Sequence, residues 1–161
     1  MRKQKIYLDT SVISHLDAPD TPEKMADTLR LWQQIQAGEY EVVLSEVVFT
    51  ELEKCVESKR DLLMSYLDEI QYSIAESGDD IVALASKFID FGVLKGKSLN
   101  DCRHIAAALL SDCDIIVSWN FKHIVNAKTI KGVRIITATE GFKDAMIYSP
   151  TMLVEGDFDN E

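Results

Sequence analysis

Three acidic residues of this 161-residue chain stand where a carboxylate is costly to place. Asp9 directly follows the apolar run at residues 6–8. Glu51 lies within the apolar stripe of a predicted helix, and Asp101 shares a helical face with Ile105. Burying an unpaired carboxylate is strongly unfavourable unless a cation neutralises it or its pKa rises. The three acids are most simply explained if they converge on a divalent cation, and ligation by oxygen alone favours Mg²⁺ or Mn²⁺ over zinc.

Each of these residues also has a structural explanation that needs no metal. Asp9 is a favoured residue for capping a helix that follows it, and Asp101 could close a Ser98-x-x-Asp101 capping arrangement. Glu51 cannot be a cap in mid-helix, so its alternative is a side chain that extends along the helix edge to water. Asn120, just past another predicted strand, is typical of a turn. The case for a shared site therefore rests on the four residues together.

Four basic or titratable residues nearby have less specific patterns. His104 and His123 lack the spacing of metal ligands, so structural roles or contacts with a substrate are favoured over ligation. Lys95 and Lys97 are typical of a solvated loop. Their position shortly before Asp101 also allows a contact with a phosphate group.

The hydrophobic pattern predicts alternating strands and helices. Strands are predicted at 5–9, 41–44, 115–117 and 133–136, and helices at 23–37, 62–70, 81–89, 99–110 and from a cap at Ser45 through Glu51. Strands separated by helices favour a parallel sheet with helices on both faces. Ligands of such folds bind at the carboxyl ends of the strands. The three acids and Asn120 are therefore expected to meet at one edge of the sheet.

Length and composition restrict the class of protein. The length fits one domain, predicted for residues 1–154, and the acidic segment 155–161 is expected to be a disordered tail. Cys55, Cys102 and Cys113 have no C-x-x-C spacing and indicate reduced thiols in a cytoplasmic protein. No apolar run reaches the length of about 18 residues that a membrane span needs. The net charge of −10 disfavours a nonspecific nucleic-acid binder but leaves room for a nuclease with a few local cations.

Four short stretches around the candidate residues resemble the PIN-domain family in their order and spacing. They are Tyr-Leu-Asp-Thr-Ser at 7–11, the segment 45–52 that ends in Glu-Leu, Leu-Asn-Asp at 99–101 with Ile-Ala-Ala-Ala after it, and Ile-Val-Ser-Trp-Asn-Phe at 116–121. The resemblance extends over residues 5–138, and Ile-Tyr-Ser-Pro at 147–150 is similar to the C-terminal strand and proline of many members. The chain most resembles single-domain members of the VapC toxin type.

The resemblance implies a three-layer α/β/α fold with a central, mostly parallel sheet, and the activity of a metal-dependent ribonuclease. In the family, the acids matching Asp9, Glu51 and Asp101 hold one or two Mg²⁺ or Mn²⁺ ions, and the hydroxyl matching Ser11 supports the site. Attack of a water molecule in line with the leaving oxygen cuts RNA and leaves a 5′-phosphate. Members of the toxin type often form homodimers and are inhibited by a small antitoxin encoded beside them.

Asn120 departs from the resemblance, because many members carry an aspartate there. An amide oxygen can ligate a hard cation but adds no charge, which puts a second metal ion in doubt. The alternative to a nuclease is therefore a catalytically weak PIN fold that binds RNA or protein. If the substrate is RNA, Lys95, Lys97 and His123 are candidates for contacts with it.

Two other enzyme classes do not fit the sequence. A phosphatase of the haloacid-dehalogenase type also begins with an aspartate after a strand, but it needs a second aspartate at the position of Ser11. The seven glycines form neither a G-x-G-x-x-G nor a G-K-S/T motif, which excludes the usual nucleotide-binding folds.

Overall fold

The computed structural model describes residues 2–76, 78–92 and 99–155. Within them, a five-stranded sheet has the order β3-β2-β1-β4-β5. The strands are β1 (Gln4–Leu8), β2 (Tyr40–Leu44), β3 (Ser73–Ile74), β4 (Ile115–Val117) and β5 (Met146–Tyr148). Every pairing is parallel, so the carboxyl ends of the strands share one edge of the sheet.

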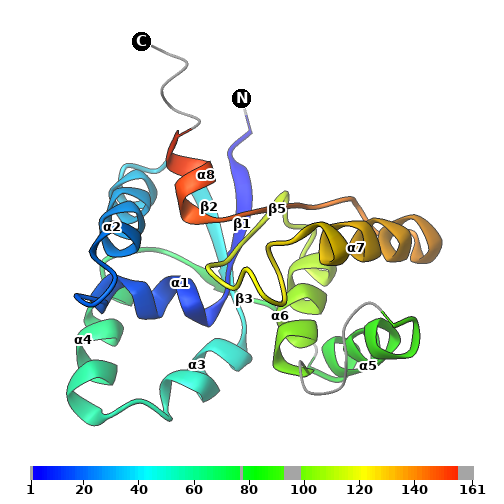
Figure 1. Cartoon of the computed structure of the whole chain (residues 1–161), viewed down its shortest axis with the longest axis horizontal. Helices are drawn as coiled ribbons and strands as arrows, with labels where there is room; N and C mark the ends of the chain where they lie inside the picture. Colours follow the sequence, from blue (N-terminus) through cyan, green and yellow to red (C-terminus); the bar gives the residue numbers. More distant parts are fainter. Residues whose placement is uncertain (1, 77, 93–98, 156–161) are drawn as a thin grey trace.

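Helices cover both faces of the sheet (Figure 1). They are α1 (Thr10–Ser14), α2 (Pro22–Gln36), α3 (Glu46–Leu52), α4 (Glu57–Leu67), α5 (Gly78–Asp90), α6 (Leu99–Leu110), α7 (Ala127–Glu140) and α8 (Pro150–Glu155), with a 3₁₀ turn η1 (His15–Asp17) after α1. The apolar side chains of α1–α4 and α8 pack on one face, and those of α5–α7 pack on the other. The three-layer α/β/α fold with a parallel sheet is therefore confirmed.

The central strand β1 buries side chains on both of its faces. Tyr7 packs with the apolar cluster beneath α5–α7, whereas Ile6 and Leu8 pack with the cluster beneath α1–α4 and α8. Successive side chains of a strand point to opposite faces of the sheet. A strand covered on both faces therefore has a continuous apolar run, which is what the sequence has directly before Asp9.

The predicted strand at 133–136 is wrong, since these residues lie in the middle of α7. β-branched residues favour strands. In α7, however, the buried positions recur at helical spacing, with Val133 and Ile136 packed in the core. The side chain of Asn126 caps the start of the helix, and Gly141 ends it with a φ of 77°. Good caps and a helical burial pattern outweigh the strand propensity of four residues.

Three other expectations have different outcomes. The strand and proline expected at 147–150 are confirmed by β5 and the first residue of α8. Lys95 and Lys97 lie outside the described residues, as does the expected tail 155–161 apart from Glu155, which is the last residue of α8. In the part of the chain that the structure describes, no helix is both long enough and apolar enough to cross a membrane.

Asp114 joins the start of β1 to the start of β4. Its Oδ2 accepts a hydrogen bond from the backbone nitrogen of Lys5 at 2.7 Å. Its Oδ1 lies 3.1 Å from Nη2 of Arg2 and also contacts Nζ of Lys143. Burial acts to raise the pKa of Asp114, but these three donors outweigh it and hold the pKa well below its usual range. The ionised carboxylate therefore stabilises the folded state.

We expect Asp114→Asn to lower the free energy of unfolding by about 1–2 kcal/mol near neutral pH, since solvent partly screens the site. Because the folded-state pKa is depressed, the stabilisation is present above the unfolded pKa of about 4 and is lost as the pH falls below it. Urea denaturation at neutral and acidic pH measures both effects. Asp144→Asn removes the exposed partner of Arg134 and is the control. An equal loss in that control would contradict the role given to Asp114.

Candidate active site

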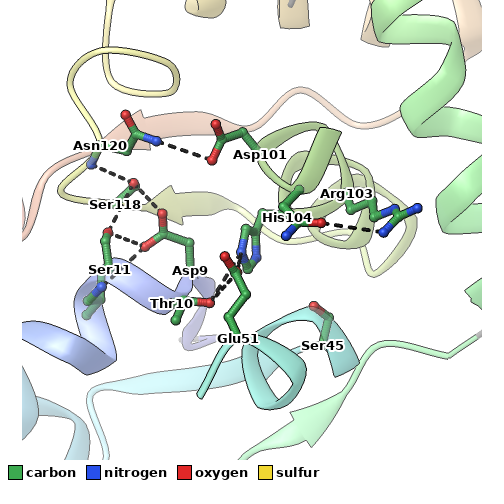
Figure 2. A network of polar contacts seen from close by, with 12 residues as sticks. Asp9, Thr10, Ser11, Ser45, Glu51, Asp101, Arg103, His104, Ser118 and Asn120 are labelled. Carbon is green, nitrogen blue, oxygen red and sulfur yellow. Dashed lines mark hydrogen bonds and ion pairs between the residues drawn. The ribbon is translucent and has the colours of Figure 1, made fainter. Parts of the chain in front are cut away.

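The carboxyl ends of β1 and β4 bring together the residues that the sequence singled out. Asp9 directly follows β1, and Asn120 lies in the loop after β4. Glu51 lies near the end of α3, and Asp101 lies in the first turn of α6. Figure 2 shows the four side chains grouped at this edge of the sheet. The predicted meeting of elements from distant parts of the chain is therefore observed.

Asp9 is the most buried of the three acids, with 3% of its surface exposed. Its Oδ1 accepts hydrogen bonds from the Ser11 hydroxyl at 2.5 Å and from the backbone nitrogen of Val12 at 3.3 Å. Its Oδ2 accepts one from the Ser118 hydroxyl at 2.5 Å. Asp9 is thus also the cap of α1, so the capping explanation holds together with a place in the site. Burial raises the pKa of Asp9 despite the opposing effects of His104 and these hydrogen bonds.

Two serine hydroxyls connect Asp9 to the loop after β4 (Figure 2). The Ser11 oxygen accepts a hydrogen bond from the backbone nitrogen of Trp119, and the Ser118 oxygen accepts one from that of Asn120, both at 2.9 Å. Each hydroxyl therefore donates to the carboxylate and accepts from the loop. The sequence predicted a supporting role for Ser11, and Ser118 is an equal partner that it did not assign.

Glu51 is held by a chain of hydrogen bonds that begins in the core. Its Oε1 lies 2.7 Å from Nε2 of His104 and 2.7 Å from the hydroxyl oxygen of Thr10 (Figure 2). On the far side of the imidazole ring, Nδ1 lies 2.6 Å from the hydroxyl oxygen of Tyr7, which lies 2.7 Å from that of Ser45. Because a carboxylate only accepts, Nε2 donates to Glu51, and Nδ1 of a neutral ring then accepts from Tyr7.

The hydrogen bonds to Glu51 keep its carboxylate ionised. Burial acts to raise the pKa of Glu51, but the hydrogen bonds from His104 and Thr10 outweigh it and lower the pKa. Oε1 is fully engaged, whereas Oε2 accepts no hydrogen bond from any residue that the structure describes. The alternative of a side chain that merely reaches water therefore does not account for Glu51.

Sequence reasoning missed the partnership between Glu51 and His104. The histidine is buried, and it follows Asp101 by three residues on α6, so the two side chains share a helical face. That spacing was the available signal. Ser45 stands at the N-cap of α3 as predicted, but its hydroxyl makes no cap hydrogen bond and contacts Tyr7 instead.

Asn120 faces Asp101 with its nitrogen and not with its oxygen. Its Nδ2 lies 3.2 Å from Oδ1 of Asp101 (Figure 2). Its Oδ1 accepts a hydrogen bond from the backbone nitrogen of His123 at 2.9 Å. The backbone N–H requires an acceptor, which fixes this orientation of the amide. In this orientation the amide oxygen of Asn120 supports its own turn, and its role as a metal ligand stays a prediction.

The charge on Asp101 is influenced by several groups around it. Burial raises its pKa, the histidines 104 and 123 act to lower it, and the carboxylates of Asp9 and Glu51 act to raise it. These effects show that the three acids lie near enough to repel one another when ionised. His123 is thus placed beside Asp101, and its contact with RNA stays a prediction, as do those of Lys95 and Lys97.

The donor set fits a hard divalent cation. Within the described residues, no three His, Cys, Asp or Glu side chains form a group that could hold one metal ion. Mg²⁺, however, is usually held by one or two carboxylates, with water and substrate phosphate as its other ligands. Asp9 and Asp101 match that requirement, since burial raises both pKa values and a cation would relieve the repulsion between them. The convergence of all three acids on one ion stays a prediction.

We expect Tyr7→Phe to lower the free energy of unfolding by about 1–3 kcal/mol, because it leaves the buried Nδ1 of His104 without a donor. Thermal and urea denaturation measure the loss. Combining it with Ser45→Ala should cost less than the sum of the single changes, since both hydroxyls belong to one network. Tyr148→Phe, which removes an exposed hydroxyl that contacts Met146, is the control. Equal effects of the two tyrosine changes would contradict the buried chain.

The family of the chain follows from its sequence and agrees with this fold. The family model described as PIN domain matches residues 6–126. The match spans most of the chain, including the last three residues of β1, the four site residues and the loop after β4. The chain therefore belongs to the PIN domain family. A search of curated proteins found no match to the sequence.

Solved structures with the same fold include three VapBC complexes. A chain of VapBC-1 from nontypeable Haemophilus influenzae has 17% identity and a TM-score of 0.57, with 92% of this chain and 99% of that chain covered. A chain of DNA-bound VapBC from Salmonella typhimurium has 13% identity and a TM-score of 0.54, with 91% and 98% covered. A chain of the VapBC2 complex from Rickettsia felis, which is bound to a DNA fragment from its promoter, has 14% identity and a TM-score of 0.51. The match covers 91% of this chain and 98% of that chain.

Proposed function

We propose that this protein is a metal-dependent ribonuclease that hydrolyses RNA phosphodiester bonds, with Mg²⁺ or Mn²⁺ as its cofactor. The observation that carries the proposal is the pair of carboxylates at the carboxyl edge of the sheet, where Asp9 is buried and Asp101 is half-buried. Burial raises both of their pKa values, and the charges of Asp9 and Glu51 act to raise that of Asp101 further. A site that concentrates negative charge in a buried place is suited to a divalent cation, and membership of the PIN domain family supports the same function.

Asp9 and Asp101 would hold the cation. Activation of a water molecule and neutralisation of charge on the phosphate are the chemistry that such an ion supplies when bound. Ser11 and Ser118 orient the Asp9 carboxylate through hydrogen bonds of 2.5 Å. His104 fixes Glu51 so that its unengaged oxygen, Oε2, is available to water or to the ion. The product would carry a 5′-phosphate on the downstream fragment.

Two features make a toxin of a type II toxin–antitoxin pair the best biological setting. The chain belongs to the PIN domain family, and its fold is similar to chains of VapBC complexes. In this setting the protein would form a homodimer, bind a small antitoxin protein and be located in the cytoplasm. An adjacent reading frame for a small DNA-binding protein is the observation that supports it. Its absence would leave the nuclease proposal standing and remove the toxin.

Purified protein incubated with total cellular RNA tests the proposed activity. We expect new 5′-phosphate ends in the presence of Mn²⁺ or Mg²⁺, none after chelation, and far fewer with Asp9→Asn. Mapping of these ends also identifies the RNA target. Cleavage by Asp9→Asn at the wild-type rate would show a contaminating nuclease and contradict the proposal.

A PIN fold that binds RNA or protein with weak or no catalysis is the second candidate. The orientation of Asn120 supports it, because the amide adds no charge and donates its N–H to Asp101. This candidate predicts RNA or protein binding that does not depend on a divalent cation, with no new 5′ ends at any metal concentration.

A further inference from the structure

The loop after β4 that bears Asn120 also carries an exposed aromatic ring. Phe121 is 48% exposed and directly follows Asn120, whose side chain contacts Asp101. A single exposed phenylalanine is common on protein surfaces and by itself indicates nothing. The surroundings of this ring are what set it apart.

The ring stands on a fixed support. Trp119 is buried, and its indole Nε1 donates to the hydroxyl of Thr28 on α2 at 2.9 Å. The same hydroxyl donates to the backbone oxygen of Lys24 at 2.6 Å. Phe121 contacts Trp119 edge to face, with ring centroids 6.3 Å apart, and its backbone nitrogen donates to the Trp119 oxygen. The loop after β4 and the first turns of α2 therefore form one unit.

A cation completes this unit. Nζ of Lys24 lies 5.5 Å from the ring centroids of both Trp119 and Phe121, so the two rings hold the ammonium group in place. Among the residues that the structure describes, no carboxylate pairs with it. In a chain with a net charge of −10, a positive charge that is positioned but not neutralised is available to an anionic ligand.

We propose that Phe121 and Lys24 form a nucleotide subsite, in which a base of single-stranded RNA stacks on the Phe121 ring and an adjacent phosphate pairs with the Lys24 ammonium. The proposal rests on the proposed function, because it places a nucleotide next to the phosphate to be cut. Stacking on an aromatic ring can bind any base and does not require a basic surface, so it is compatible with an acidic protein. The subsite therefore supplies affinity that the acidic surface cannot.

The test is binding of a fluorescent single-stranded RNA in chelator, where cleavage does not compete. We expect Phe121→Ala to weaken binding by about 5- to 100-fold, as base stacking on an aromatic ring does elsewhere, and Phe121→Trp to preserve it. Phe91→Ala is the matched control, because Phe91 is 60% exposed at the end of α5, on the other face of the sheet. Lys24→Gln should lower the slope of log affinity against log salt by roughly one.

An RNA with abasic sugars at its central positions separates stacking from a general loss of structure. Wild type should bind this RNA less tightly than the intact one, and Phe121→Ala should bind the two almost equally. Melting temperatures like that of wild type establish that the variants are folded. If wild type binds RNA and Phe121→Ala keeps both the affinity and the preference for bases, the subsite is overturned and the proposed function stands. If wild type binds no RNA in chelator, the subsite is overturned, whereas the proposed function is judged separately by cleavage in Mn²⁺ or Mg²⁺.

Discussion

Replacing Asp9 by asparagine is expected to reduce RNA cleavage by roughly 100- to 1000-fold or more, the size of effect seen when one charge-stabilising group is removed from an active site. Asp9 is nearly inaccessible to solvent, so water cannot compensate for the loss of its charge beside the proposed cation. Initial rates with a mapped RNA substrate measure the effect. Adding Asp101→Asn should reduce the rate far less than the product of the single effects, because in the proposed site both residues hold one ion.

The same change should preserve or increase the stability of the metal-free protein. Burial raises the folded-state pKa of Asp9, so ionisation destabilises the fold at a pH above the unfolded value of about 4. Asn cannot ionise, and the variant should therefore lose less stability than wild type as the pH rises toward neutrality. Asp20→Asn, which removes an exposed charge, is the control for both rate and stability. A variant that loses activity only because it unfolds would contradict this account.

Replacing Asn120 by aspartate is expected to have opposite effects on metal binding and on the metal-free protein. The change replaces an N–H donor 3.2 Å from Asp101 by a carboxylate oxygen. Loss of the hydrogen bond and repulsion between the two acids should lower the free energy of unfolding by about 1–3 kcal/mol without metal. The added anionic oxygen should tighten binding of Mn²⁺ or Mg²⁺. Calorimetric titration and urea denaturation with and without metal measure the two effects.

The pH dependence of this variant has a definite sign. Two adjacent carboxylates raise each other's pKa, so the destabilisation is largest when both are ionised and disappears as the pH falls and one is protonated. Gln71→Glu is the control, since it adds the same charge at an exposed position before β3. If Asn120→Asp changes neither metal affinity nor stability, Asn120 has no influence on the site.

Much of this site could be predicted because it depends on local patterns and on general rules of connection. An apolar run that ends in an acid places Asp9 at the end of a buried strand, and helices between strands make that sheet parallel. Parallel strands share one carboxyl edge, so residues after β1 and β4 had to meet there. The strand predicted at 133–136 failed because its β-branched residues are packed at helical spacing against a core that only the folded chain provides.

The sequence by itself determined the α/β class, the edge at which the site lies, and the acids that occupy it. Only the tertiary structure decided the partners of those acids. The contact between Glu51 and His104 joins residues 53 positions apart, and that between Tyr7 and His104 joins residues 97 apart. Spacing can place His104 on the face of α6 that bears Asp101, but the packing of α3, α6 and β1 decides which distant residues its ring contacts. The orientation of Asn120 was likewise decided by a backbone donor that its turn supplies.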